Sequence, residues 1–146
     1  MDGFTITPIG HVRCEDKRED LGPEYIDERK GREAILEIVP EYAEGFQDIE
    51  NFTHVYVLFI FHRSGHANLI AHPPGDGRPH GVFATRSPHR PNGIGLTVVR
   101  LLRHEGDRLF VSGADMIDGT PIIDIKPYTH GDIVTEAKGS WVGHKD

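Results

Sequence analysis

The chain has 146 residues, 37% of them hydrophobic, which is enough for one domain but too little for two independent cores. Its formal net charge is -7, from 16 lysine and arginine residues against 23 acidic ones, and this excludes a protein that coats nucleic acid over its whole surface. The longest apolar run, residues 55–61, is far shorter than the roughly 20 residues that cross a bilayer. The N-terminus has neither the basic nor the apolar region of a secretory signal, so we expect a cytoplasmic protein with no membrane partner.

Charge is unevenly distributed along the chain. Residues 15–50 include thirteen acidic and five basic residues, whereas residues 61–104 include six arginines and a single acidic residue, Asp76. A basic stretch within an acidic protein indicates a local anion site rather than an extended track for nucleic acid. Alternatively, these arginines only neutralise acidic residues that fold against them.

Short segments with strand composition, separated by turns, dominate the chain. We expect strands at residues 4–13, 34–39, 54–62, 81–85, 96–102, 108–114 and 121–126, with a hairpin turn at 104–107. Residues 54–62, HVYVLFIFH, are nearly all apolar, which predicts burial on both faces. Residues 41–52 place apolar side chains at helical spacing and predict one or two short helical turns. Residues 14–32 and 64–80 are expected to be long loops.

This pattern predicts a mainly β fold, a small antiparallel β-barrel with few short helices and long loops. Strands and helices do not alternate, and no GxGxxG motif follows a strand. Both observations argue against a Rossmann-type domain.

The segment 81–97, GVFATRSPHRPNGIGLT, is the most informative part of the sequence. Arg86 and Arg90 lie four residues apart on a proline-rich turn, where two guanidinium groups can hold carboxylate or phosphate oxygens. Gly93 and Gly95 allow backbone N–H groups to approach a ligand closely. Two arginines alone would more often be a solvated turn, so the argument depends on the longer motif.

The longer motif resembles the signature of the TsaA-like family, the tRNA N6-threonylcarbamoyladenosine methyltransferases, which reads A-T-R-S-x-x-R-P-N-x-I-G-x-T/S. The matching residues are Ala84, Thr85, Arg86, Ser87, Arg90, Pro91, Asn92, Ile94, Gly95 and Thr97. Residues 9–13, 58–62 and 118–128 agree with the family as well. The resemblance covers about residues 4–130, so we expect a domain at 4–130 and a C-terminal tail at 131–146.

The resemblance implies a small β-barrel that binds S-adenosylmethionine and acts as a homodimer. It further implies methylation of N6 of a threonylcarbamoyl-modified adenosine adjacent to the anticodon of tRNA. After Arg13 the sequence departs from the family pattern, because Cys14, Glu15 and Asp16 stand where many relatives continue differently.

Within this resemblance, several residues are expected to contact cofactor or substrate. Arg86 can hold the carboxylate of the cofactor or a substrate phosphate, Phe61 can supply an aromatic wall, and Asp115 can accept hydrogen bonds from ribose hydroxyls. The expected cofactor-binding residues are Cys14, Glu15, Asp16, Phe61, His62, Arg63, Arg86, Leu96 and Asp115. The expected substrate-binding residues are Arg78, Arg90 and Asn92, with further tRNA contacts from Arg86, Arg100 or Arg103.

Methyl transfer from a sulfonium depends mainly on aligning the nucleophile, the methyl carbon and the leaving sulfur. The target nitrogen is a weak nucleophile because its lone pair is delocalised, so a base must assist the loss of its proton. The candidate bases are His62, His89, Asp118 and Asp124, and the sequence does not choose among them. Asp118 can equally be a turn residue of the sequence DGTP.

Metal and disulfide chemistry are not expected. His62 and His66 are four residues apart, but they lie where a strand runs into a loop and not on a helix. Cys14 is the only cysteine, so the chain can form neither an internal disulfide nor a zinc site built on cysteines.

An apolar stripe predicts the oligomeric state. Its members are Val55, Val57, Phe59 and Phe61. These side chains offer more apolar surface than a barrel of this size needs, so we expect a homodimer.

Two other functions remain open at this point. One is a module that binds S-adenosylmethionine without transferring its methyl group. The other is a methyltransferase that acts on a small acceptor other than tRNA.

Overall fold

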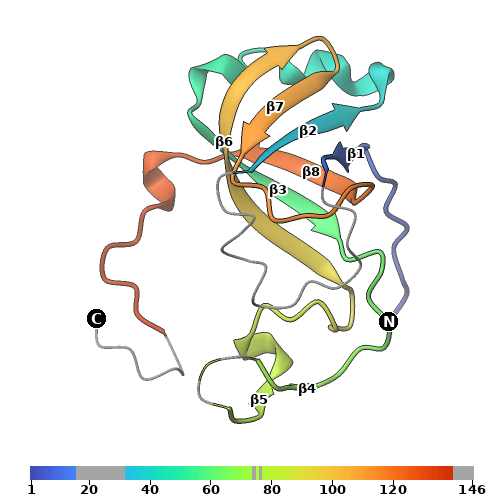
Figure 1. The fold of residues 1–146 in the computed structure, drawn as a ribbon, viewed down its shortest axis with the longest axis vertical. Helices are drawn as coiled ribbons and strands as arrows, with labels where there is room; N and C mark the ends of the chain where they lie inside the picture. The colour runs from blue at the N-terminus through green and yellow to red at the C-terminus, as the bar shows by residue number, and fades with distance from the viewer. Residues whose placement is uncertain (16–31, 74, 76, 140–146) are drawn as a thin grey trace.

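The computed structural model describes residues 1–15, 32–73, 75 and 77–139. In this part of the chain, six antiparallel strands close into a barrel in the order β1-β2-β7-β6-β3-β8 (Figure 1). These strands are β1 (Gly10–Arg13), β2 (Glu33–Ile38), β3 (His54–Ile60), β6 (Ile94–Glu105), β7 (Arg108–Ser112) and β8 (Pro121–Pro127). A separate two-stranded sheet pairs β4 (Ile70–Ala71) with β5 (His80–Gly81). The prediction of a mainly β fold built on a small antiparallel barrel is confirmed.

Helical structure in the described residues is limited to short 3-10 turns. They are η2 (Pro40–Phe46), η3 (Ile49–Asn51), η4 (Val82–Ala84) and η5 (His130–Asp132). The helical turns expected at residues 41–52 are confirmed by η2 and η3, which place Phe46 and Ile49 against the barrel core. None of these helices is long and apolar enough to cross a membrane.

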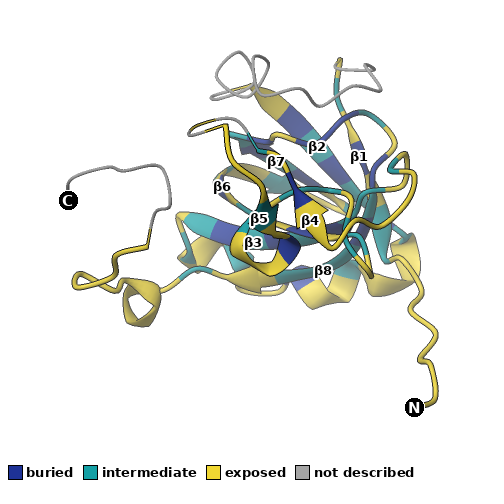
Figure 2. Cartoon of the chain, turned by 90° about the horizontal axis from the view of Figure 1, so that it is seen from below, coloured by how far each residue is buried: buried dark blue, intermediate teal, exposed yellow. Residues whose placement is uncertain are grey.

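The core fills the inside of the barrel, because alternate residues of each strand point inward. On β3 the inward residues Val55, Val57 and Phe59 are at most 5% exposed, whereas the residues between them are only partly buried. The expectation that this strand is buried on both faces is therefore wrong. A single-layered barrel leaves one face of each strand on the outside, and Figure 2 shows buried segments interspersed with partly exposed ones along the strands.

Two expected strands differ from the observed ones. Of residues 4–13, only Gly10–Arg13 pairs in the barrel, and Phe4 is exposed. Of residues 81–85, Gly81 ends the short strand β5, and Val82–Ala84 form the turn η4 and not a strand. The Thr85 amide and the Thr85 hydroxyl both donate to the carbonyl of Val82, which closes the turn, and this local bonding competes with strand pairing.

The hairpin expected at residues 104–107 is present between β6 and β7. Glu105 pairs with Arg108, and Gly106 adopts φ of 61°, a left-handed conformation that glycine accepts without strain. On the inner side, His104 packs against Phe46 with ring centroids 4.9 Å apart. We call this end of the barrel, where η2, η3 and the β6–β7 turn meet, the hairpin end.

Candidate functional site

The opposite end of the barrel collects the loops that carry the signature. In the antiparallel barrel, β1, β3 and β7 end where β2, β6 and β8 begin, as the pairing of His11 with Pro121 and of Ile60 with Ile94 shows. The loops that follow Arg13 and Ile60 therefore meet the loops that precede Ile94 and Pro121. We call this the signature end.

Arg90 holds the signature loop in shape. Its Nη1 atom donates to the carbonyls of Thr85 and Ser87, both at 3.0 Å, and the amide of Gly93 donates to the carbonyl of Arg90 at 3.2 Å. The half-buried guanidinium thus satisfies backbone groups that the irregular loop leaves without partners. The structure gives Arg90 a positioning role within the loop.

The hydroxyl groups of the motif brace the same loop. The Thr85 hydroxyl accepts a hydrogen bond from the amide of Ser87, and the Ser87 hydroxyl accepts one from the amide of His89, each at 3.2 Å. Arg86 lies between them with an exposed side chain, and within the described residues this side chain forms no hydrogen bond or ion pair. The polar groups of Thr85, Ser87 and Arg90 therefore form hydrogen bonds within the loop, whereas the Arg86 guanidinium is available to bind an anion.

The signature loop is joined to the segment that follows β3. The amide of Phe61 donates to the carbonyl of Gly93 at 2.8 Å, and the Ser64 hydroxyl donates to the carbonyl of Pro88 at 3.1 Å. The ring of Phe61 packs edge-on against Phe59, with centroids 5.1 Å apart. These contacts hold the loop against the segment from which His62 and Arg63 project into solvent.

A second set of contacts positions the loop after β1. The amide of Cys14 donates to Oδ1 of Asp118 at 3.0 Å, and the Cys14 thiol lies 3.5 Å from the carbonyl of Met116. The amide of Gly119 donates to the carbonyl of Val12 at 2.7 Å. The Asp118 carboxylate thus fastens Cys14 to the segment that contains Asp115.

The structure brings most of the expected cofactor-binding residues to the signature end. Those in its loops are Cys14, Glu15, Phe61, His62, Arg63, Arg86 and Asp115. Leu96 lies two residues into β6 on the outer face of the barrel, and Asp16 lies outside the described residues. Asn92 belongs to the signature loop, whereas Arg78 lies in the connection between β4 and β5.

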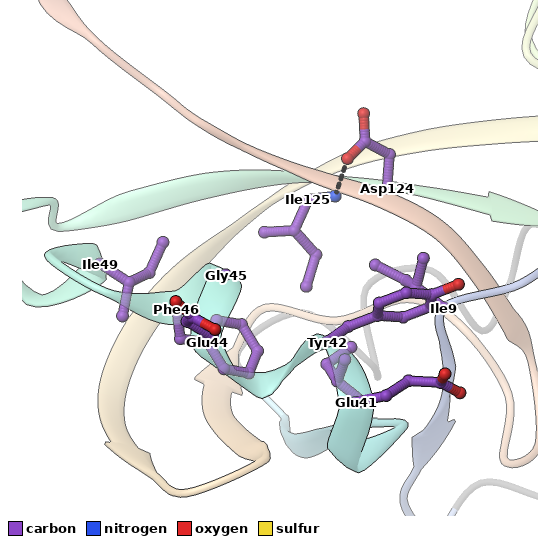
Figure 3. Close-up of a pocket in the computed structure, with 10 residues that line it drawn as sticks. Ile9, Glu41, Tyr42, Glu44, Gly45, Phe46, Ile49, Asp124 and Ile125 are labelled. Atoms are coloured by element: carbon purple, nitrogen blue, oxygen red, sulfur yellow. Dashed lines mark hydrogen bonds between the residues drawn. The ribbon is translucent and has the colours of Figure 1, made fainter.

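Asp124 lies outside these loops. It pairs with Leu58 on the outer wall, its Oδ1 accepts a hydrogen bond from the amide of Ile125 at 2.8 Å, and its Oδ2 lies 3.0 Å from Nζ of Lys126. Ile125 points the opposite way, into a cavity of about 470 Å³ at the hairpin end. Figure 3 shows the Asp124 carboxylate directed away from that cavity, whose walls are mostly isoleucine and aromatic side chains.

Some contacts at the signature end could not be predicted from the sequence. The hydroxyl of Ser64 also lies 2.9 Å from Nδ1 of His89, and a serine in a loop carries no signal in the sequence that predicts such a contact. The partner of Asp118 could not be foreseen either, because Cys14 is 104 residues away along the chain. Within the described ranges, no group of three or more His, Cys, Asp or Glu side chains is placed to hold a metal ion.

The residues at the signature end form a donor and acceptor set that suits a zwitterionic nucleoside. An exposed guanidinium can bind a carboxylate, a half-buried aromatic ring can pack against a purine or a sulfonium, and an exposed aspartate can accept hydrogen bonds from hydroxyl or amino groups. These groups are Arg86, Phe61 and Asp115.

The chain is similar in sequence to several known proteins. The chain is 46% identical over 138 residues to a probable S-adenosyl-L-methionine-binding protein of Archaeoglobus fulgidus, covering 93% of this chain and 37% of that protein. It is 53% identical over 92 residues to the tRNA (adenine(37)-N6)-methyltransferase of Mus musculus, covering 61% of this chain and 21% of that protein. The chain thus spans well under two thirds of either relative.

A solved structure shares the fold. The crystal structure of TrmO from Pseudomonas aeruginosa superimposes with a TM-score of 0.77 at 37% sequence identity, over 94% of this chain and 62% of that one. Residues 14–132 match the family described as the tRNA-methyltransferase O N-terminal domain, which confirms the resemblance inferred from the signature. The chain belongs to the tRNA-methyltransferase O N-terminal domain family.

Proposed function

We propose that this protein is an S-adenosylmethionine-dependent methyltransferase that acts on N6 of a threonylcarbamoyl-modified adenosine adjacent to the anticodon of tRNA. The observation that carries the proposal is the convergence of Arg86, Phe61 and Asp115 at one end of the barrel, on loops fixed by their own hydrogen bonds. The names of the relatives, an S-adenosyl-L-methionine-binding protein and a tRNA adenine-37 N6-methyltransferase, support the cofactor and the target base.

The fixed loops suit a reaction that depends on alignment. When bound, S-adenosylmethionine supplies the methyl group, so the chain's own residues must orient the two reactants and exclude alternative poses. Arg86 would bind the carboxylate, and Phe61 and Asp115 would hold the nucleoside part. Arg90 and Asp118 would contribute indirectly, because their hydrogen bonds hold these loops in position.

Among the candidate bases, we assign His62. It follows the end of β3 directly, its side chain is exposed at the signature end, and its backbone is fixed by a hydrogen bond from its amide to the carbonyl of Ile60 at 2.8 Å. Asp118 is engaged by the amide of Cys14, His89 by the hydroxyl of Ser64, and Asp124 by Lys126 on the outer wall. A neutral imidazole at His62 would accept the proton that N6 loses as the methyl group arrives.

The homodimer is proposed on a different surface from the one that the sequence indicated. The stripe of Val55, Val57 and Phe59 faces the barrel core, so it cannot form an interface. The outer face of β6 exposes apolar side chains instead, and they pair directly with Ile60, Leu58 and Tyr56 of β3. These exposed residues are Ile94, Leu96 and Val98, with 38%, 50% and 40% exposure. A second copy covering this face would remove an apolar patch from water.

Methyl transfer to defined tRNAs tests the proposal. The protein is incubated with methyl-labelled S-adenosylmethionine and with tRNA that either carries or lacks the threonylcarbamoyl group. We expect label only in the modified tRNA. Label in both tRNAs would refute the requirement for the threonylcarbamoyl group. Cofactor binding without label in any tRNA would support a binding module or an enzyme with a small acceptor, which are separated by adding small nucleosides.

A further inference from the structure

Strand β6 contains a β-bulge that changes which side chains face outward near the hairpin end. Leu101 pairs with Val111 on the core side, but the register then shifts, and Arg103 pairs with Phe110 on the outer side. In a regular strand, Arg103 would point into the core, because alternate residues share a face. Bulges re-aim side chains in this way, so the outward position of Arg103 follows from the backbone itself.

The Arg103 side chain lies on an aromatic ring. Its Cζ atom is 3.7 Å from the centroid of Phe110, and Cζ of Arg108 is 5.6 Å from the same centroid. Arg100 pairs with Ser112, two residues further along the same outer face. We call this group the arginine platform, and it consists of Arg100, Arg103, Arg108 and Phe110.

The platform is open to a polyanion. The Arg103 side chain is 58% exposed, and its ion pair with Glu105, with Nε and Oε2 3.1 Å apart, is exposed on both partners. Glu105 is the only acidic residue of β6 and β7. Exposed ion pairs contribute little to stability, so phosphate groups can displace this carboxylate. A chain of net charge -7 thus has a cluster of arginines on the outer face of β6 and β7 near the hairpin end.

We propose that the arginine platform is an RNA-binding surface that holds the tRNA substrate away from the methylation site. The guanidinium groups would bind phosphates, and an unpaired base would stack on the Arg103–Phe110 pair. The aromatic ring favours RNA over an acidic protein as the partner, because a base offers a flat surface for stacking. The inference rests on the proposed function for the identity of the RNA.

The location of the platform agrees with this role. Arg103 lies eight positions after Gly95, which is at the signature end, and this is a span of roughly 25 Å at the rise of a β-strand. A tRNA whose target base enters the signature end would therefore reach the platform with nucleotides outside the site. Loss of the platform should weaken RNA binding and leave cofactor binding unchanged.

Fluorescence anisotropy with labelled, threonylcarbamoyl-modified tRNA tests the platform directly. We expect the double variant Arg103→Ala/Arg108→Ala to bind this tRNA about tenfold more weakly or worse, and the slope of log affinity against log salt to fall by about 1.5. Glu105→Gln should tighten binding because it frees Arg103. The matched control is Lys126→Ala, which removes an exposed cation that is likewise paired with a carboxylate, Asp124, at 3.0 Å. We expect its affinity to stay within twofold of the wild type.

Several outcomes would overturn the proposal. One is unchanged tRNA affinity in a double variant that retains its circular dichroism spectrum and its cofactor affinity. Another is an equal loss of tRNA affinity in the control variant Lys126→Ala, which would indicate a general effect of positive charge. If the double variant loses affinity for polyglutamate but not for tRNA, the partner of the platform is an acidic protein and not RNA. The binding assays are independent of the methyl-transfer assay. If the double variant binds tRNA more weakly but the wild type transfers no methyl group, the proposed function is refuted and the RNA-binding surface stands. If the wild type transfers methyl groups to tRNA but the double variant binds tRNA with unchanged affinity, the proposed function stands and the RNA-binding surface is refuted.

Discussion

The ring of Phe59 covers Gly95 so closely that a β-carbon at residue 95 would overlap three atoms of the ring. The two residues are paired between β3 and β6, and both are buried. Gly95 of the signature is therefore required by packing.

Gly95→Ala should lower the free energy of unfolding by about 1–3 kcal/mol, the usual cost of overpacking a core. Urea denaturation of the variant measures this loss. In the double variant Gly95→Ala/Phe59→Leu, the added methyl group has room, so we expect its cost to be much smaller than in the single variant. An equal cost in both backgrounds would show that the ring is not what excludes the side chain.

Arg86→Ala should reduce cofactor affinity or turnover by roughly 10- to 100-fold, the worth of a charged hydrogen bond of about 1.5–3 kcal/mol. The unfolding midpoint should not change, because the exposed Arg86 side chain forms no hydrogen bond or ion pair within the described residues. Calorimetric titration and urea denaturation separate the two effects. Unchanged affinity together with unchanged turnover would remove Arg86 from the site.

Arg90→Ala should behave differently. It leaves the carbonyls of Thr85 and Ser87 without their donor, so we expect a loss of about 1–3 kcal/mol in the stability of the loop or of the whole fold. Faster hydrogen exchange at the amide of Gly93 would report local opening. Exchange and unfolding both equal to the wild type would show that Arg90 does not hold the loop.

Asp118 offers a test of positioning against catalysis. Asp118→Asn keeps an oxygen that can accept the hydrogen bond from the Cys14 amide, whereas Asp118→Ala removes it. If Asp118 only positions the loop, the Ala variant should have a raised KM for the cofactor, and the Asn variant should restore it with near-normal kcat. A large fall of kcat in Asp118→Asn would instead identify Asp118 as the base and displace His62.

The contact between His104 and Glu50 predicts pH-dependent stability. Nδ1 of His104 lies 2.8 Å from Oε1 of Glu50, and its Nε2 lies 2.7 Å from the carbonyl of Gly106. Only the protonated ring can donate to both, and the hydrogen bond with Glu50 raises the pKa of His104 above 6.5. The same bond lowers the pKa of Glu50 below 4.5.

The sign of each contribution follows from these directions. The stabilisation from His104 is complete below pH 6.5 and is lost as the pH rises through its higher folded-state pKa. That from Glu50 is complete above pH 4.5 and is lost as the pH falls through its lower folded-state pKa. The pair should therefore stabilise the fold most between pH 4.5 and 6.5. Urea midpoints of the wild type relative to Glu50→Gln should show an advantage at pH 5.5 that shrinks at pH 8.5, and a constant difference would contradict this account.

Local patterns in the sequence predicted the strands and the signature loop, but not which face of a strand looks inward. Residues 54–62 are apolar on both faces, so alternation could not separate the core side from the outer side, and the apolar stripe was assigned to an interface although it fills the barrel. The sequence predicted a strand at η4 because β-branched and aromatic residues favour strands. The hydrogen bond from the Thr85 hydroxyl to the carbonyl of Val82 stabilises a turn instead.

Contacts between distant segments could not be predicted from one sequence. The bond from Cys14 to Asp118 and the bulge that turns Arg103 outward depend on strand register, which long-range pairing determines. The sequence therefore predicted most of the residues that lie at the signature end, but not the contacts that distinguish Arg86 from Arg90.

Calorimetric titration of the protein with S-adenosylmethionine tests most directly whether the signature end is a cofactor site. We predict saturable heat with one molecule bound per chain, strongly reduced in Arg86→Ala and unchanged in Lys126→Ala. Absence of heat with both S-adenosylmethionine and its demethylated product, at concentrations far above those of typical cofactor sites, would contradict the account.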